Sequence, residues 1–317
     1  MGTGAMQTYD QVGIKEDISD IISNISPTKT PFLSMIGSES IHSTLFQWQE
    51  DSLQSVAAMA AVEGATAPTA AWQATVMRSN RTQIFTSTAQ ASGTADVVEK
   101  YGRAQELAYQ LSMRASELKR NLEYAFVGVG SGQAVVTGND TTARQMNGYQ
   151  AQIATATQVN ASAGVLTEAM VLSAAQACYI NGADPDTLMI KPVDGTKIAQ
   201  WQYNSVAGGN RYKVADQKDK SIVNVVDIYE SPYGSLRVVM NRFLHGANTT
   251  ASDGINDTTS DTLVFEASMW KKCVLRNWFR QTLAKTGDST QVQILGEFSL
   301  KHLNQKASGL IYGGSVS

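Results

Sequence analysis

The stretch ADVVEKYGRAQELAYQLSMRASELKRNLEYAFV, residues 95–127, decides the fold that we expect for this chain. Small or apolar residues recur in it in alternating steps of four and three, which predicts one long helix with a buried seam. The seam consists of Val97, Tyr101, Ala104, Ala108, Leu111, Ala115, Leu118, Leu122 and Ala125. At about 1.5 Å per residue such a helix is roughly 50 Å long. A compact domain does not need this length, so the helix suggests a subunit of an assembly.

The composition of the seam indicates what the helix packs against. A heptad pattern alone would also suit a coiled coil. The alanines at 104, 108, 115 and 125 instead favour close packing on a sheet. The natural partner is a β-hairpin that we expect near the C-terminal end of the sequence, at residues 270–303.

A polar ribbon is expected directly before this helix. Residues 45–92 predict two long strands, one through Phe46 and Trp48 and the other from Trp72 to Thr88, joined by the alanine-rich stretch Ser55 to Thr69. The second strand is polar on both faces, and an isolated two-stranded ribbon is marginally stable in water. We therefore expect an arm whose partner is another molecule.

The N-terminal region predicts a short amphipathic helix. Its isoleucines fall on one helical face, and Pro27 and Pro31 end it. These isoleucines are Ile14, Ile18, Ile21, Ile22 and Ile25. The helix is either part of the core or a docking element, and the sequence leaves both open.

The second half of the chain mixes helix and strand patterns, which makes the expected fold class α+β. Helices are expected at 167–181 and 193–203, with strands at 187–190, 222–229 and 235–241, a surface loop at 247–261, and a final hairpin of 272–284 with 291–303. The turns Ser231-Pro232-Tyr233-Gly234 and 285–289 join the two hairpins.

Composition and charge exclude several classes of protein. The 317 residues carry a formal charge of -3, and 17% are charged, so there is no electrostatic footprint for nucleic acid. Cys178 and Cys273 lie far apart and are expected to be reduced and buried. No signal peptide or membrane-spanning stretch is found, so we expect a soluble protein without a membrane partner.

No set of residues predicts a catalytic, cofactor-binding or metal site, so we expect no enzyme and no cofactor. The glycines of residues 128–132 close a helix instead of opening one, which favours helix termination over phosphate binding. His42, His245 and His302 lack the spacing of metal ligands. Asp184 and Asp186 flank Pro185, and a solvated turn before a strand accounts for them.

One basic and aromatic cluster lies in the first strand of the final hairpin: Trp270, Lys271, Lys272, Arg276, Trp278, Phe279 and Arg280. Alternation places Lys272, Arg276, Trp278 and Arg280 on one face, and Cys273, Leu275 and Phe279 on the other. A half-buried strand with a basic face is favoured. A phosphate contact through Arg276 and Arg280 remains a hypothesis.

Short motifs in a fixed order carry a resemblance to a known family. They are Tyr9-Asp10-x-Val12-Gly13-Ile14-x-Glu16-Asp17, Ser26-Pro27-Thr28-x-Thr30-Pro31-Phe32, Glu63-Gly64-Ala65, Tyr101-Gly102-Arg103-x-x-Glu106-Leu107-Ala108-Tyr109, Glu117-Leu118-Lys119-Arg120-x-Leu122-Glu123, Trp270-Lys271, Leu275-Arg276, Leu283-Ala284-Lys285-Thr286-Gly287-Asp288-Ser289 and Lys306-Ala307-Ser308-Gly309. With the order of expected elements, they make the chain similar to the major capsid (major head) protein of tailed double-stranded DNA bacteriophages. The resemblance spans about residues 9–310.

This resemblance implies the fold and domain organisation of a tailed-phage major capsid protein. The expected parts are an N-terminal arm at 1–44, an extended loop (β-ribbon) at 45–92, a peripheral domain with spine helix and connector at 93–164, an axial domain at 165–268, and a peripheral-domain hairpin with C-terminal return at 269–317. Residue pairs that cross-link neighbouring subunits are not assigned.

The resemblance also implies the function and the partners. The chain would assemble with itself into hexamers and pentamers that form an icosahedral head around double-stranded DNA, without sequence-specific binding. Portal, scaffold and decoration proteins are further expected partners. Its place is the virion capsid, assembled in the host cytoplasm. The alternatives are an encapsulin-like nanocompartment shell protein and a long-helix adaptor protein.

Overall fold

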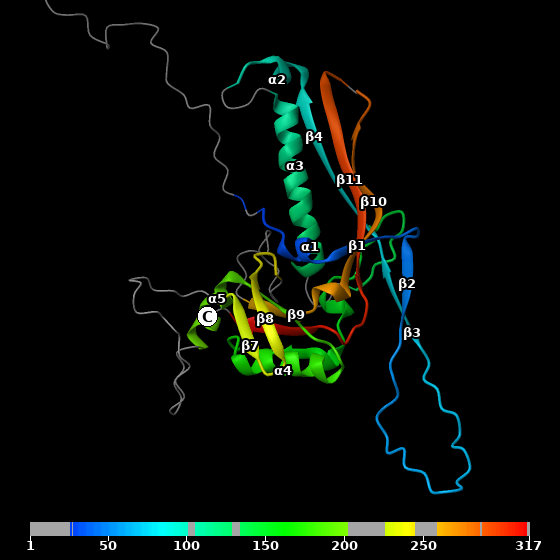
Figure 1. Ribbon diagram of the computed structural model, residues 1–317. Helices are drawn as coiled ribbons and strands as arrows, with labels where there is room; N and C mark the ends of the chain where they lie inside the picture. The colour runs from blue at the N-terminus through cyan, green and yellow to red at the C-terminus, as the bar shows by residue number, and fades with distance from the viewer. Residues whose placement is uncertain are drawn as a thin grey trace, which may run out of the picture.

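The computed structural model describes residues 26, 28–100, 105–128, 134–201, 226–244, 259–285 and 287–315. Figure 1 shows a four-stranded sheet beside an upright helix, a six-stranded sheet below them, and a ribbon that projects from their junction. The amphipathic helix expected at 14–25 lies outside the described residues, as do 222–225 and 247–258.

The four-stranded sheet contains the final hairpin as predicted. The order of its strands is β1 (Gly37–Ser40), β10 (Trp270–Thr282), β11 (Ser289–His302) and β4 (Gln83–Ser92). Strand β11 pairs antiparallel with both β10 and β4, whereas β1 is parallel to β10. Strand β4 is the inner half of the strand expected at 72–88. Its Phe85, Ala89 and Ala91 are buried, so this part belongs to the subunit's own core and not to a free arm.

The long helix is shorter than predicted. A first short helix, α2 (Gly93–Val97), begins where the Ser92 hydroxyl accepts a hydrogen bond from the backbone N–H of Ala95 at 3.2 Å. It ends at Val98, whose φ of -67° and ψ of 128° are extended. The β-branched pair Val97 and Val98 explains this end, because such side chains lose rotamer freedom in a helix. The main helix, α3, runs over Glu106–Glu123 and is about 27 Å long at 1.5 Å per residue.

Among the described residues of the predicted seam, only those at its C-terminal end are buried. Leu118, Leu122 and Ala125 are in the core, whereas Ala108 and Ala115 are exposed. The helix packs mainly on β4 and less on β11, so the expected sheet contact is confirmed but its main strand is not part of the final hairpin. Beyond α3 the chain makes one π-helical turn, Tyr124–Gly128.

The six-stranded sheet collects strands from distant parts of the chain. Its order is β5 (Gln158–Asn160), β12 (Gly309–Ser315), β9 (Thr259–Phe265), β6 (Thr187–Ile190), β8 (Gly234–Met240) and β7 (Ile228–Ser231). Helices α4 (Glu168–Ile180) and α5 (Pro192–Trp201) accompany it, and single 3-10 turns occur at Gln150–Gln152, Thr155–Thr157 and Ala267–Met269.

Several predictions in this region are confirmed and others are wrong. Helix α4, strand β6, helix α5 and strand β8 lie where the sequence places them. Strand β7 pairs with β8 as expected, but it runs over Ile228–Ser231, so within the described residues it begins later than the strand expected at 222–229. Strand β9 begins inside the expected loop 247–261. Strand β12 was not predicted from the sequence, and it belongs to the six-stranded sheet. It lies there between β5 and β9, with which it forms ladders.

One aromatic core connects the two sheets. Phe32, in the short helix α1 (Pro31–Met35), is fully buried, and its ring centroid lies between 5.5 and 6.3 Å from those of Phe126, Tyr149, Phe265 and Trp270. These residues come from the π turn after α3, the connector, β9 and β10. The two sheets therefore share one continuous core.

A buried carboxylate at the end of α3 holds α1 in place. Glu123, the last residue of α3, accepts hydrogen bonds from the backbone N–H groups of Phe32 and Leu33, both at 2.8 Å, and from the Asn241 amide at 2.7 Å. Burial raises the pKa of Glu123, while these donors act in the opposite direction. The carboxylate satisfies N–H groups in the first turn of α1 that have no intrahelical partner.

Candidate assembly surface

The ribbon presents an exposed apolar segment. Its strands β2 (Leu45–Glu50) and β3 (Val76–Arg81) pair antiparallel, with Leu45 opposite Arg81 and Glu50 opposite Val76. The intervening residues 51–75, the ribbon tip, form no strand and project from the subunit (Figure 1). Five large apolar side chains of the tip are at least 82% exposed: Leu53, Val56, Met59, Val62 and Trp72. Gathered on one segment, such side chains mark a surface for another protein.

The root of the ribbon, which is the paired part formed by β2 and β3, is by contrast held by its own subunit. The Glu50 carboxylate pairs with Arg78 across the ribbon at 2.9 Å and accepts a hydrogen bond from the backbone N–H of Gln305 at 3.0 Å. The Asn80 amide donates to the Leu300 carbonyl at 2.6 Å. The expectation of an arm without contacts to its own domain is therefore wrong for the root, which Leu300 of β11 and Gln305 hold in place.

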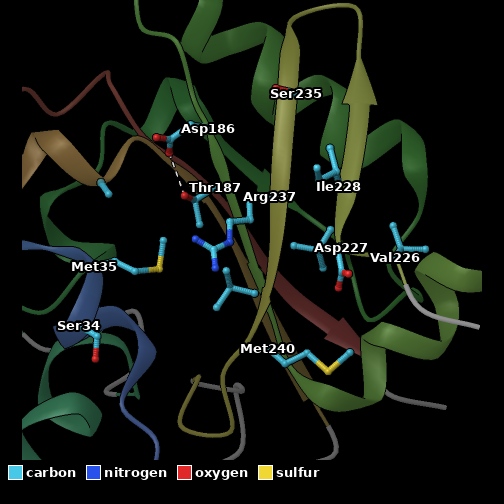
Figure 2. Close-up of a pocket in the computed structure, with 13 residues that line it drawn as sticks. Ser34, Met35, Asp186, Thr187, Val226, Asp227, Ile228, Ser235, Arg237 and Met240 are labelled. Carbon is cyan, nitrogen blue, oxygen red and sulfur yellow. Dashed lines mark hydrogen bonds between the residues drawn. The ribbon is translucent and has the colours of Figure 1, made fainter.

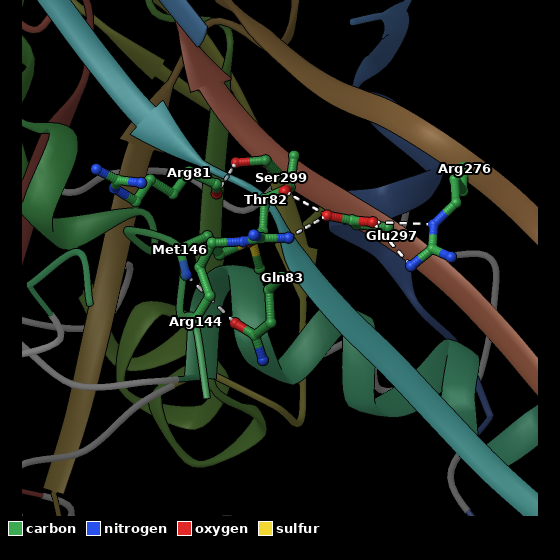
Figure 3. A network of polar contacts seen from close by, with 8 residues as sticks. All are labelled: Arg81, Thr82, Gln83, Arg144, Met146, Arg276, Glu297 and Ser299. Atoms are coloured by element: carbon green, nitrogen blue, oxygen red, sulfur yellow. Dashed lines mark hydrogen bonds and ion pairs between the residues drawn. The ribbon is translucent and has the colours of Figure 1, made fainter. Parts of the chain in front are cut away.

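A buried polar network lies where the ribbon meets the sheet (Figure 3). At its centre is Glu297 of β11, which is 3% exposed. It accepts a hydrogen bond from the Thr82 hydroxyl at 2.6 Å, pairs with Arg276 at 2.9 Å, and pairs with Arg144. Glu297, Thr82 and Arg144 lie far apart in the chain, and no local pattern in the sequence predicts that they come together.

An open cleft of about 1160 Å³ lies between α1 and the β7–β8 hairpin (Figure 2). Met35, Ile228 and Met240 form much of its apolar wall. Its Asp186 carboxylate accepts a hydrogen bond from the Thr187 hydroxyl at 2.8 Å. The described lining contains no histidine, cysteine or lysine that would activate its two serines as nucleophiles.

The histidines are not brought together by the described part of the fold. His302 ends β11 and is buried, with its ring stacked on that of Trp270 at a centroid distance of 3.9 Å. Its Nε2 lies 3.0 Å from the Ser308 hydroxyl, and burial lowers its pKa to about 4. His42 is exposed in the turn before β2, and His245 lies outside the described residues. His302 is thus a packed core histidine.

The cysteines, the Asp184–Asp186 pair and the glycine segment, which were candidate site residues in the sequence, form no site in the described structure. Cys178 and Cys273 are buried free thiols, as predicted, and burial raises the pKa of each to about 12. Asp184 and Asp186 are exposed in the segment before β6. Gly128 ends the π turn, while residues 129–132 lie outside the described chain.

Strand β10 is half-buried, as favoured, but two irregularities change the expected faces. Its register with β11 shifts between Val274 and Arg276 and again between Arg276 and Phe279. As a result Trp278 packs on Phe298 with ring centroids 4.7 Å apart, while Phe279 is 41% exposed. The predicted alternation was wrong here. Of the two residues in the phosphate hypothesis, Arg276 pairs with Glu297 and Arg280 is exposed.

No group of three or more histidine, cysteine or acidic side chains is placed to hold a metal ion within these residues. No helix in the described ranges combines the length and the apolar character needed to cross a membrane.

Solved structures with the same arrangement include a phage capsid and an encapsulin. The capsid of cyanophage P-SCSP1u matches with a TM-score of 0.59 and 14% identity, covering 96% of this chain and 93% of that one. Mycobacterium phage Ogopogo gives a TM-score of 0.60 at 11% identity, with coverage of 94% and 96%. The SrpI encapsulin of Synechococcus elongatus PCC 7942 gives 0.58 at 8% identity, with coverage of 93% and 94%. The chain therefore has the α+β fold of tailed-phage major capsid proteins, which encapsulins share.

Sequence relationships narrow this class to one family. The family described as SU10 major capsid protein matches residues 2–314. The major capsid protein of Escherichia phage Phieco32 is 31% identical over 354 aligned positions, covering 96% of this chain and 96% of the relative. The chain belongs to the SU10 major capsid protein family. It is a phage structural protein of the virion capsid, and the likeness to an encapsulin concerns the fold alone.

Proposed function

We propose that this capsid protein self-assembles into hexamers and pentamers that close into an icosahedral head around double-stranded DNA. The observation that carries the proposal is the ribbon tip, residues 51–75, whose large apolar side chains face solvent beyond a root that the subunit itself braces. Obligate assemblies bury a few thousand Å² per interface. A projecting segment of 25 residues laid across a neighbour adds area that a flat contact would not provide.

The proposed domain organisation follows the sheets. An N-terminal arm at 1–44 leads into the extended loop, which reaches from residue 45 to Arg81. The four-stranded sheet with α3 forms the peripheral domain. The axial domain contains the six-stranded sheet with α4 and α5, and strand β12 supports its extension to residues 309–315.

The chemistry of the chain suits a container for DNA that is packaged by other proteins. A formal charge of -3 over 317 residues provides no strong attraction for the phosphate backbone, so binding to DNA is not sequence-specific in this proposal. The portal, a scaffold and decoration proteins are the proposed partners besides further copies. Assembly takes place in the host cytoplasm, without a membrane or a cofactor, and the chain has no catalytic role.

Replacing residues 52–74 by a short Gly-Ser linker tests the role of the ribbon tip. The wild-type chain should form closed shells in negative-stain electron microscopy, whereas the variant should remain as unassembled subunits or capsomers with an unchanged far-ultraviolet circular dichroism spectrum. Shells of normal size from the shortened chain would contradict the proposal.

A milder variant has a matched control. The triple change Leu53→Ser, Met59→Ser and Trp72→Ser removes apolar contacts from the tip without shortening it. The double change Val97→Ser and Ile180→Ser removes two side chains that are 84% and 74% exposed outside the ribbon. Assembly should fall at least tenfold in the triple variant and stay near the wild-type level in the control.

A further inference from the structure

Thr82 is the single residue between strand β3 of the ribbon and strand β4 of the sheet. Strand β3 pairs with β2 as far as Arg81, and β4 pairs with β11 from Gln83 onward. Thr82 lies between these two ladders and is fully buried. The direction in which the ribbon leaves the subunit therefore depends on the backbone at this residue and on the link of residues 41–44, to which Thr82 is hydrogen-bonded.

Three different segments hold the polar groups of Thr82. Its N–H donates to the Thr44 carbonyl at 2.9 Å, and its carbonyl accepts a hydrogen bond from Arg144 Nε at 2.6 Å. Its hydroxyl donates to Glu297 at 2.6 Å. Rotation of the ribbon about this residue would break hydrogen bonds inside a buried site, where unpaired polar groups are costly.

Glu297 joins these contacts into one unit. Its Oε1 receives the Thr82 hydroxyl and Arg144, and its Oε2 receives Nε and Nη2 of Arg276, each at 2.9 Å. Arg276 lies between the two register shifts of β10, at the position opposite Glu297. Both carboxylate oxygens are thus occupied, and loss of the carboxylate would leave two arginines without their anion.

The segment that carries Arg144 is itself fixed to the ribbon root. The Met146 N–H donates to the Gln83 side chain at 3.4 Å, and the Asn147 N–H donates to the Asn80 side chain at 2.9 Å. Arg144 therefore approaches Thr82 from a segment that is hydrogen-bonded to residues on both sides of it. Figure 3 shows the contact between Met146 and Gln83.

We propose that the junction of Thr82, Arg144 and Glu297 is a positioning device that fixes the direction of the ribbon before any neighbouring subunit is bound. An arm held in its bound direction loses little conformational entropy on association, so assembly is faster and tighter. The junction's importance for assembly rests on the proposed function of the ribbon tip, whereas its effect on ribbon direction does not.

Spin-label distances on full-length chains measure the ribbon direction. Gln49→Cys on β2 and Ala108→Cys on α3 introduce two exposed thiols, while the native cysteines are buried. Doubly labelled chains are diluted into unlabelled ones. The wild-type junction should give one narrow distance distribution, and Glu297→Gln should at least double its width. Thr82→Val, which replaces the hydroxyl by a methyl group, should also broaden the distribution. If Glu297→Gln does not fold, the width measured for Thr82→Val tests the proposal.

Glu117→Gln is the matched control, since it removes an ion pair with Arg114 on α3, away from the junction. It should leave the distribution narrow. A broad wild-type distribution, or unchanged widths in both junction variants, would overturn the proposal. If the junction variants broaden the distribution but form shells as fast as the wild type, the link to assembly is overturned, while replacement of residues 52–74 tests the tip itself.

Discussion

His302 shows how one buried side chain makes the subunit sensitive to acid. Its pKa is about 4 in the folded chain because burial disfavours the charged ring, against about 6.5 when unfolded. Below pH 6.5 the unfolded chain takes up a proton that the folded chain does not. The free energy of unfolding should therefore fall from pH 6.5 to pH 4, by on the order of 3 kcal/mol in total.

Urea denaturation between pH 4 and pH 7 measures this effect. His302→Gln should flatten the dependence in this range, while His42→Gln, at an exposed position, should not. An equal slope for His302→Gln and the wild type would show that other groups cause the loss of stability.

At the scale of elements, the sequence predicted those helices and strands whose position depends on a local pattern of residues. Helix α4, strand β6 and the β10–β11 hairpin are continuous segments with clear periodicity or a turn, and the sequence placed them correctly. The strands β1, β5, β9 and β12 are short or flanked by polar residues, and distant pairing defines them. The bulges of β10 also escape an alternating pattern, because the pairing with β11 creates them.

The heptad pattern of α3 also did not determine which of its positions are buried in the subunit, and this leads to a prediction. The heptad pattern is continuous from Ala108 to Ala125, but only Leu118, Leu122 and Ala125 of its positions in this range are buried. Leu122→Ala, at a position 2% exposed, should lower the free energy of unfolding by about 2–5 kcal/mol through the cavity that it leaves.

The matched changes Ala108→Ser and Ala115→Ser on the same seam should each cost less than about 0.5 kcal/mol, because both positions are exposed in the subunit. Chemical denaturation of unassembled subunits compares the three variants. A large loss in either alanine variant would mean that the N-terminal part of the seam is packed within the subunit.

At the scale of the whole molecule, the shared aromatic core predicts that the two sheets open together. Cys178 lies on α4 beside the six-stranded sheet and Cys273 on β10 in the other sheet, and each thiol has a pKa of about 12. Thiol labelling at pH 8 with peptide-level mass spectrometry should detect both cysteines at the same urea concentration. Labelling of one cysteine at clearly lower urea would show two independent folding units.

The position of β12 has a consequence for biosynthesis. This strand fills the place between β5 and β9 in the six-stranded sheet. In the other sheet, β4 pairs with β11, which is synthesised about 200 residues later. Ribosomes add about 5–20 residues per second, so residues 1–315 take roughly 15–60 s to make. During that time neither sheet is complete. A nascent chain interrupted before Gly309 has a gap inside a sheet, so only subunits translated past this strand are competent to enter a shell.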